Sequence, residues 1–138
     1  EYPCHQGIQR LVKNLNQLYR DLPALHNYDF EWRGFEWIDC NDADNSVLSF
    51  IRRSDDQFVI VAVNLTPQPH HGYRIGVPEA GNYREIFNSD SEFYSGSNMG
   101  NGGDALLADE LQWMNQPYSL SLTLPPLAAI ILQLEHDV

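Results

Sequence analysis

The clearest hydrophobic pattern lies near the C-terminus, where apolar and hydroxyl side chains alternate over residues 118–124. A period of two is typical of a β-strand with one buried face and one wet face, so hydroxyl residues such as Ser119 are expected to face solvent. Residues 127–134 form an almost wholly apolar run, which predicts a strand covered on both faces. Pro125 and Pro126 separate the two runs because proline donates no backbone hydrogen bond. We therefore expect a closing hairpin with a tight proline corner.

Earlier apolar runs predict further strands. Residues 58–63 are apolar at every position, which favours a central place in a sheet. The short polar segment 53–57 is typical of a hairpin turn. The long polar stretch 88–111 contains a glycine-rich segment, 96–103, and is expected to be either functional or a plain flexible loop. The expected strands, whose spacing favours an antiparallel β-sandwich, are 35–38, 46–52, 58–65, 73–77, 83–87, 118–124 and 127–134.

One amphipathic helix is predicted over residues 6–19, before this mainly β region. Its apolar residues recur every three or four positions, and polar residues fill the other side. Leu22 precedes Pro23, and a residue in that position avoids the helical region, so the helix is expected to end there. Such a stripe needs a partner, which is the rest of this chain, a domain outside it, or a second copy. The stripe consists of Ile8, Leu11, Val12, Leu15, Leu18 and Tyr19.

Composition narrows the class of protein. The chain has 138 residues and 43% hydrophobic content, which suits one globular domain. Its net charge of −11, with only 8 basic residues, argues against nucleic acid and anionic membranes as partners. No apolar run approaches the ~18 residues of a membrane span. No secretory signal is visible, and Cys4 and Cys40 show no disulfide or metal pattern, so we expect a cytoplasmic protein with reduced thiols. The chain has no initiator Met, as in a fragment or a processed product.

No motif predicts a catalytic, metal or cofactor site. The acidic segment 39–45 fails the EF-hand ligand pattern in the registers that start at Asp39 and at Asp42, so it is expected to be a turn. The five histidines lack the spacing of a zinc site, and the glycine-rich segment lacks the lysine of a phosphate loop. Glycosidic chemistry needs two acids opposed across a cleft, whereas the acids here lie in turns and loops. We expect no active site in this chain.

Aromatic residues are the remaining candidates for binding. An exposed aromatic ring offers a flat platform to the C–H face of a sugar, although structural aromatics are commoner. Trp37, in a predicted strand, is expected in the core. Phe93, Tyr94 and Trp113 lie in or beside the long loop and are the candidates for contact with a glycan.

Several segments, in order along the chain, resemble bacterial glycogen branching enzymes. GIQRLV at 7–12, with 15–16, 18–20, 23–26 and 29–30, resembles the last barrel helix of this family and the segment after it. GFEWI at 34–38 resembles the opening of the family's C-terminal β domain. The remaining matches are SVLSFIRR at 46–53, VNLTP at 63–67, YREIFNSD at 83–90, GSN and GNGG within 96–103, and SLSLTLPPLA at 119–128.

The resemblance implies a parent enzyme of the α-amylase superfamily, which cuts an α-1,4-glucan and rejoins it as an α-1,6 branch through a covalent glycosyl intermediate. Its three catalytic acids would lie on a (β/α)8 barrel preceding Glu1, so none is assigned to this chain. Residues 1–33 would then be the last helix and exit segment of the barrel, and 34–138 the C-terminal β-sandwich. We expect the chain to brace the barrel, to contact α-glucan weakly and to be inactive alone.

Two alternatives remain open from the residues. A stand-alone carbohydrate-binding module requires aromatic rings exposed in a row. An interaction domain without sugar affinity requires a large apolar patch and shows no response to added maltooligosaccharide.

Overall fold

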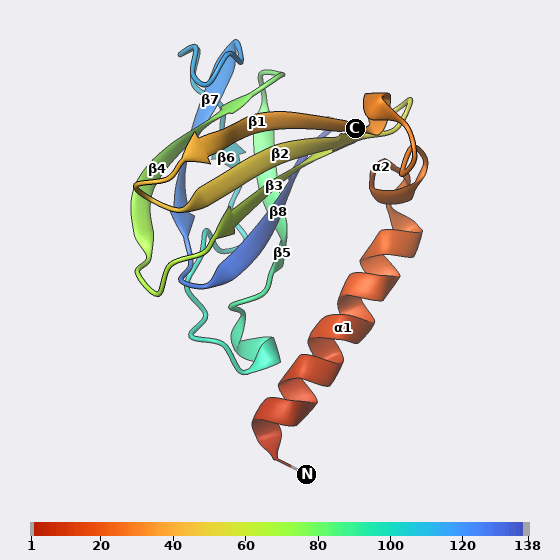
Figure 1. Ribbon diagram of the computed structural model, residues 1–138, viewed down its shortest axis with the longest axis vertical. Helices are drawn as coiled ribbons and strands as arrows, with labels where there is room; N and C mark the ends of the chain where they lie inside the picture. Colours follow the sequence, from red (N-terminus) through yellow and green to blue (C-terminus); the bar gives the residue numbers. More distant parts are fainter. Residues whose placement is uncertain (1, 137–138) are drawn as a thin grey trace.

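Two antiparallel β-sheets face each other in the computed structural model, which describes residues 2–136 (Figure 1). The larger sheet has six strands, and its outer face carries the long N-terminal helix α1. Its strand order is β1 (Phe35–Asp42), β2 (Val47–Arg53), β3 (Phe58–Asn64), β8 (Ala128–Leu134), β5 (Asn82–Asn88) and β6 (Leu106–Leu107). The smaller sheet pairs β4 (His70–Val77) with β7 (Tyr118–Leu124).

The main core lies between the two sheets. Leu120, Leu122 and Leu124 of β7 are buried there, as the alternating pattern predicts. β3 is paired with β2 on one side and with β8 on the other, which confirms its predicted central place. Its apolar side chains serve both faces, because alternate residues of a strand point in opposite directions. The antiparallel sandwich expected from the sequence is therefore confirmed.

The outer face of the six-stranded sheet has a second, smaller core beneath the helices. α1 (Pro3–Asp21) is followed by the short α2 (Pro23–His26), and Leu22 between them is extended, as expected before proline. Leu11 and Leu18 of α1 pack on this core with α2. Its buried sheet and α2 members are Ala24, Leu25, Val59, Val61, Phe87 and Ile131.

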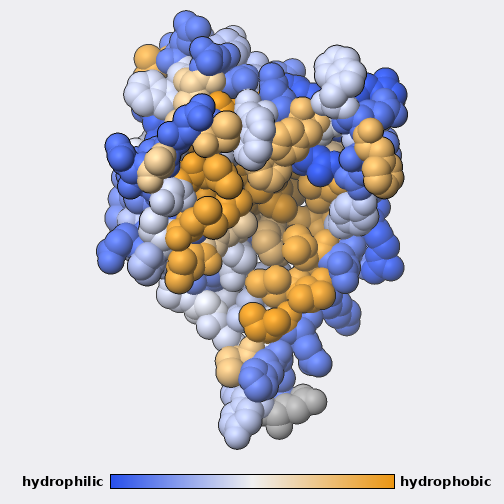
Figure 2. Space-filling view, viewed as in Figure 1, coloured by the Kyte–Doolittle hydropathy of each residue, from blue (hydrophilic) through white to orange (hydrophobic). Residues whose placement is uncertain are grey.

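The apolar stripe of α1 is packed against the sheet on one side and exposed on the other. Leu11 and Leu18 are half-buried against the sheet, whereas Ile8 and Val12 are 59% and 50% exposed. Leu15 and Tyr19 are also exposed. Figure 2 shows apolar side chains running from the sheet face onto the helix. The sandwich thus covers only one side of the stripe.

The predicted closing hairpin is wrong, because β7 and β8 belong to different sheets. Pro125 and the residues after it carry the chain from one sheet across to the other. The Asn64 side-chain amide donates to the Pro125 carbonyl over 3.1 Å, and the Leu127 amide donates to the Thr66 carbonyl over 2.8 Å. These bonds hold the crossing against the end of β3.

Ser119 is a second correction, since it is fully buried rather than facing solvent. Its backbone exchanges two hydrogen bonds with Asp109, and its hydroxyl oxygen accepts from Arg74 Nη1 over 2.8 Å. The segment before β7 folds back over this side of the strand. Several strand bounds also differ from the sequence expectation, most of them by one residue. The two largest differences are that β1 extends to Asp42, inside the predicted acidic turn, and that β4 begins at His70.

One hydrogen-bonded cluster fastens the end of α1 to the sheet. Arg52 of β2 donates to the carbonyls of Leu25 and Gly34, each over 3.1 Å, and to the carboxylate of Asp29. The Tyr19 hydroxyl, at the end of α1, donates to the other oxygen of Asp29. These two donors lower the pKa of the Asp29 carboxyl, the tyrosine hydroxyl having the larger effect.

Candidate functional site

The glycine-rich segment 96–103 is hydrogen-bonded to Asn88 and Asp90, at and just after the end of β5. Asp90 accepts hydrogen bonds from the amides of Ser97 and Met99 and from the Ser97 hydroxyl. The Asn88 side-chain amide donates to the Met99 carbonyl over 2.8 Å. The sequence signal for these bonds is the set of Asn, Asp and Ser residues, whose side chains bond to nearby backbone.

Asn101 ties the far end of this loop to both sheets. Its side-chain nitrogen donates to Glu85 Oε2 over 2.8 Å and to the Thr123 carbonyl over 3.0 Å. Its side-chain oxygen accepts from the Thr123 amide over 2.8 Å. Since Glu85 lies on β5 and Thr123 on β7, one amide side chain links the two layers.

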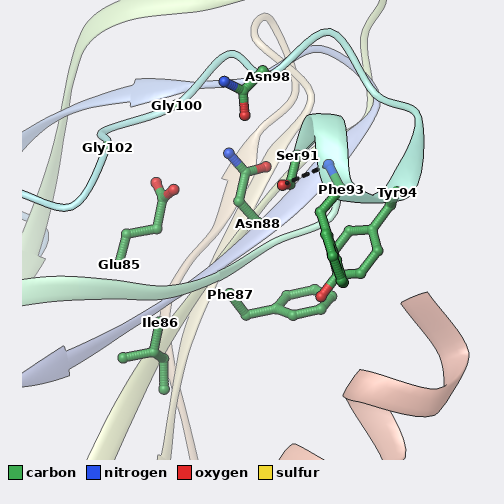
Figure 3. Close-up of a pocket in the computed structure, with 10 residues that line it drawn as sticks. All are labelled: Glu85, Ile86, Phe87, Asn88, Ser91, Phe93, Tyr94, Asn98, Gly100 and Gly102. Atoms are coloured by element: carbon green, nitrogen blue, oxygen red, sulfur yellow. Dashed lines mark hydrogen bonds between the residues drawn. The ribbon is translucent and has the colours of Figure 1, made fainter. Parts of the chain in front are cut away.

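An open pocket of about 330 Å³ lies between this loop and β5 (Figure 3). The 3-10 helix η2 (Glu92–Tyr94) forms one wall, and the backbone of Gly100 and Gly102 forms another. The pocket therefore joins three aromatic rings to amide and carboxylate groups. Its lining residues are Glu85, Ile86, Phe87, Asn88, Ser91, Phe93, Tyr94, Asn98, Gly100 and Gly102.

The aromatic wall is built jointly by η2 and α1. The rings of Phe93 and Tyr94 are 5.6 Å apart, and Phe93 is 56% exposed. Tyr94 packs toward the core and accepts a hydrogen bond from the Asn14 side chain over 2.9 Å. The Arg10 guanidinium lies 5.4 Å from the centre of the Phe93 ring. Two helix side chains thus position the two rings.

Trp113, the third predicted residue, lies away from this pocket. Trp113 precedes the first residue of β7, Tyr118, which pairs with Val77. The helix η2 instead follows the end of β5, where Asn88 pairs with Ile130 near the start of β8. β8 starts where β7 ends, and a seven-residue strand spans roughly 20 Å. Phe93 and Tyr94 are therefore brought together, and Trp113, 43% exposed, is separate from them.

Trp37 is not in the core, which corrects the sequence expectation. It is 49% exposed on the outer face of the sheet, because Ile38 takes the inward position of β1. Phe35 and Phe50 contact it, with ring centres 4.9 and 5.9 Å from its own. The missed signal was the alternation itself, since Phe35 and Trp37 fall on one face of the strand and Ile38, which serves the core, falls on the other.

The polar residues of the pocket were also missed. Glu85, Asn88 and Asn98 come from a strand and a loop separated in sequence, and no motif joins them. Only the fold of the loop over β5 brings them together.

The carboxylates with shifted pKa values do not form an acid pair. Asp29 lies against a tyrosine hydroxyl, and so does Asp42, whose pKa is lowered first by the Tyr73 hydroxyl and then by Asn45. Burial, followed by the bond to Asp42, raises the pKa of Tyr73. Within residues 2–136, His, Cys, Asp and Glu side chains form no group of three or more suited to a metal ion. No helix in the described part of the chain is long and apolar enough to span a membrane.

Comparison with known proteins places the chain in a family. Residues 37–135 match the family "Alpha amylase, C-terminal all-beta domain". The chain is 56% identical over 134 residues to the 1,4-alpha-glucan branching enzyme GlgB of Nitrosococcus oceani, and 52% identical over 134 residues to that of Cellvibrio japonicus. Each match covers 97% of this chain but 18% of the relative, so the chain spans about a fifth of their length.

A solved structure agrees on the fold. The α-amylase from Geobacillus thermoleovorans, complexed with acarbose, superposes with a TM-score of 0.56 at 18% identity, over 88% of this chain and 21% of that one. The sandwich of two sheets and the match over residues 37–135 lead to one conclusion: the chain belongs to the alpha-amylase C-terminal all-beta domain family.

Proposed function

We propose that this chain is the C-terminal β domain of a 1,4-alpha-glucan branching enzyme and that it braces the catalytic barrel of that enzyme. The identity of 56% over 97% of the chain to the relative from Nitrosococcus oceani carries this proposal. The parent transfers a segment of α-1,4-glucan to form an α-1,6 branch. In this proposal the chain alone is inactive, because the pocket found among the described residues is not lined by two opposed acids.

The outward side of α1 is the bracing surface. In this proposal, residues 1–33 are the last helix and exit segment of the catalytic barrel, and 34–138 are the C-terminal β-sandwich. Ile8 and Val12 are exposed on a helix whose other side is already packed on the sheet, so a barrel can cover them without moving α1. An exposed apolar surface of this kind marks an interaction site. In the isolated chain, the same stripe is available for pairing with a second copy.

Contact with α-glucan is a second role, which the exposed Phe93 ring beside a polar pocket favours. Tyr94 supports that ring, and Trp113 would make any sugar contact separately. We place both roles in the cytoplasm, in keeping with the two free and exposed thiols of Cys4 and Cys40.

Reassembly of the enzyme tests the bracing role. The chain is mixed with the part of the Nitrosococcus oceani enzyme that precedes the matched region, and branching of amylose is followed by iodine absorbance. We expect no change with the chain alone and branching with both parts. The double change Ile8→Gln and Val12→Glu should abolish reassembly.

Leu107→Gln is the matched control, because Leu107 is 69% exposed on β6, away from the stripe. Activity of the chain alone would refute the proposal, and so would full reassembly by the double variant. Sedimentation of the isolated chain, with and without the double change, measures self-association through the stripe.

A further inference from the structure

Two polar groups of the pocket have no hydrogen-bond partner among the described residues. Glu85 uses Oε2 for both bonds from Asn101, which leaves Oε1 free. Asn98 accepts from the Glu92 amide through its side-chain oxygen, which leaves its side-chain nitrogen free. Asn88, by contrast, is bonded at both ends, to Met99 and Asp90. The pocket therefore offers one free acceptor and one free donor group.

Gly100 keeps this space open. A Cβ atom at this position would lie 2.3 Å from Asn88 Nδ2 and 3.1 Å from Glu85 Oε1. Any side chain here would therefore enter the pocket between its polar groups. The volume of about 330 Å³ is at the small end of the range for ligand pockets, about 300–1,000 Å³.

The groups around this space suit a polyhydroxylated, uncharged ligand. A sugar hydroxyl both donates and accepts, so neighbouring hydroxyls can satisfy Glu85 Oε1 and the Asn98 amide together. A sugar also presents a C–H face to an aromatic ring, and Phe93 lines the same pocket with its ring beside that of Tyr94 (Figure 3). An anion is disfavoured by Glu85 and by the net charge of −11.

We propose that this pocket is an α-glucan subsite in which Phe93 is the platform, Glu85 Oε1 accepts from a sugar hydroxyl and the Asn98 amide donates to a sugar oxygen. The choice of α-glucan as the ligand rests on the proposed function. The site also includes α1 indirectly, because Arg10 and Asn14 hold the two rings of the wall.

Isosteric changes test the two polar groups separately from folding. Glu85→Gln keeps an oxygen for Asn101 and turns the free acceptor into a donor. Asn98→Asp keeps the oxygen that accepts from Glu92 and removes the free donors; Asn98 has φ +62°, a conformation that aspartate also tolerates. Phe93→Ala removes the platform, and Phe30→Ala, at a fully exposed ring elsewhere, is its control.

The measurement is a titration of the full 138-residue chain with maltoheptaose, followed by amide chemical shifts. We expect shifts centred on Ser91, Asn98 and Gly100. Phe93→Ala and each isosteric change should weaken binding about tenfold, a loss of about 1.4 kcal/mol. Phe30→Ala should bind as the unchanged chain does.

Three results would overturn the subsite: no shifts at these residues with maltoheptaose, unchanged affinity in all three pocket variants, or equal affinity for the β-linked cellohexaose. None of these results bears on the reassembly assay, which tests the bracing role by itself. Conversely, pocket binding without reassembly would reject the bracing role and leave the subsite intact.

Discussion

Single side chains make the connections between the layers of this protein. Arg52 of β2 donates to two backbone carbonyls and to the Asp29 carboxylate, and Asp29 in turn accepts from Tyr19 at the end of α1. Asn101 does the same for the loop, with bonds to β5 and β7. In both cases a few polar atoms join segments that are far apart in sequence.

Asp29→Asn should change the response of stability to acid. The pKa of Asp29 is lowered by folding, so the stability it contributes is present above the ordinary carboxyl value, about 4, and is lost as pH falls through the folded value. The variant should have a lower free energy of unfolding than the unchanged chain at pH 7, and this free energy should fall by less between pH 7 and pH 3. Urea unfolding of both proteins at the two pH values measures this. If the variant lost as much free energy of unfolding as the unchanged chain between pH 7 and pH 3, the prediction would be wrong.

Asn101→Ala should destabilise the folded chain by about 2 kcal/mol, because it removes the side-chain bonds to Glu85 and Thr123 and deprives the Thr123 amide of this acceptor. Asn27→Ala, at an exposed position outside this network, is the control. Thermal and urea unfolding measure both variants. A loss no larger than that of the control would show that the loop does not depend on this link.

The residues that sequence reasoning misplaced share one cause. Ser119 and Trp37 were assigned from the pattern of their own strand, but their burial depends on what a distant segment covers. Asp109 and Arg74 cover Ser119, whereas α1 leaves Trp37 uncovered. Periodicity identifies the two faces of a strand, and only the tertiary fold decides which face meets solvent.

At the level of elements, α1 and η2 meet at a glycine. A Cβ atom on Gly7 would lie 2.4 Å from the Tyr94 carbonyl oxygen, so the helix can approach the loop only without a side chain there. Gly7 is the one buried residue that α1 contributes. The contact sets the position of η2, and with it the aromatic wall of the pocket.

Gly7→Ala should therefore destabilise the chain, although the same change within an exposed helix stabilises by about 1 kcal/mol. We expect faster hydrogen exchange in the first half of α1 and a loss of about 1–3 kcal/mol from overpacking. Asn16→Ala, on an exposed position of the same helix, should be neutral or stabilising. A stabilised Gly7→Ala variant would show that α1 does not rest on η2.

The elements themselves were largely predictable, but their connections were not. The strands at 47–53, 58–64 and 82–88 and the long helix follow from periodicity. The two-residue strand β6 is too short to give a pattern. The crossing at Pro125 resembles a hairpin in sequence because proximity along the chain says nothing about which sheet receives the next strand.

At the scale of the whole molecule, the helical segment and the sandwich share a core. Leu11, Leu18 and Leu25 cover Val59 and Ile131 on the outer sheet face. The proposed boundary at residue 34 therefore divides the sequence between barrel and β domain, although the two parts share one apolar core in this structure.

Removing residues 1–33 should thus weaken the sandwich. The shortened chain should unfold at lower urea concentration, by several kcal/mol at ~25 cal/mol per Å² of newly exposed apolar surface, and should bind a hydrophobic dye. Restoring residues 1–33 as a separate peptide should reverse part of the loss. Equal stability of the two chains would show that the sandwich does not need the helix.

β8 lies between β3 and β5, although it is made after both of them. During synthesis, the ribosome releases strands β1 to β3 and β5 before the strand that must join them exists. The six-stranded sheet can therefore close only after residues 128–134 have left the exit tunnel. A premature stop codon before this point would leave two separate sheet edges, and unpaired edges of this kind are prone to aggregation.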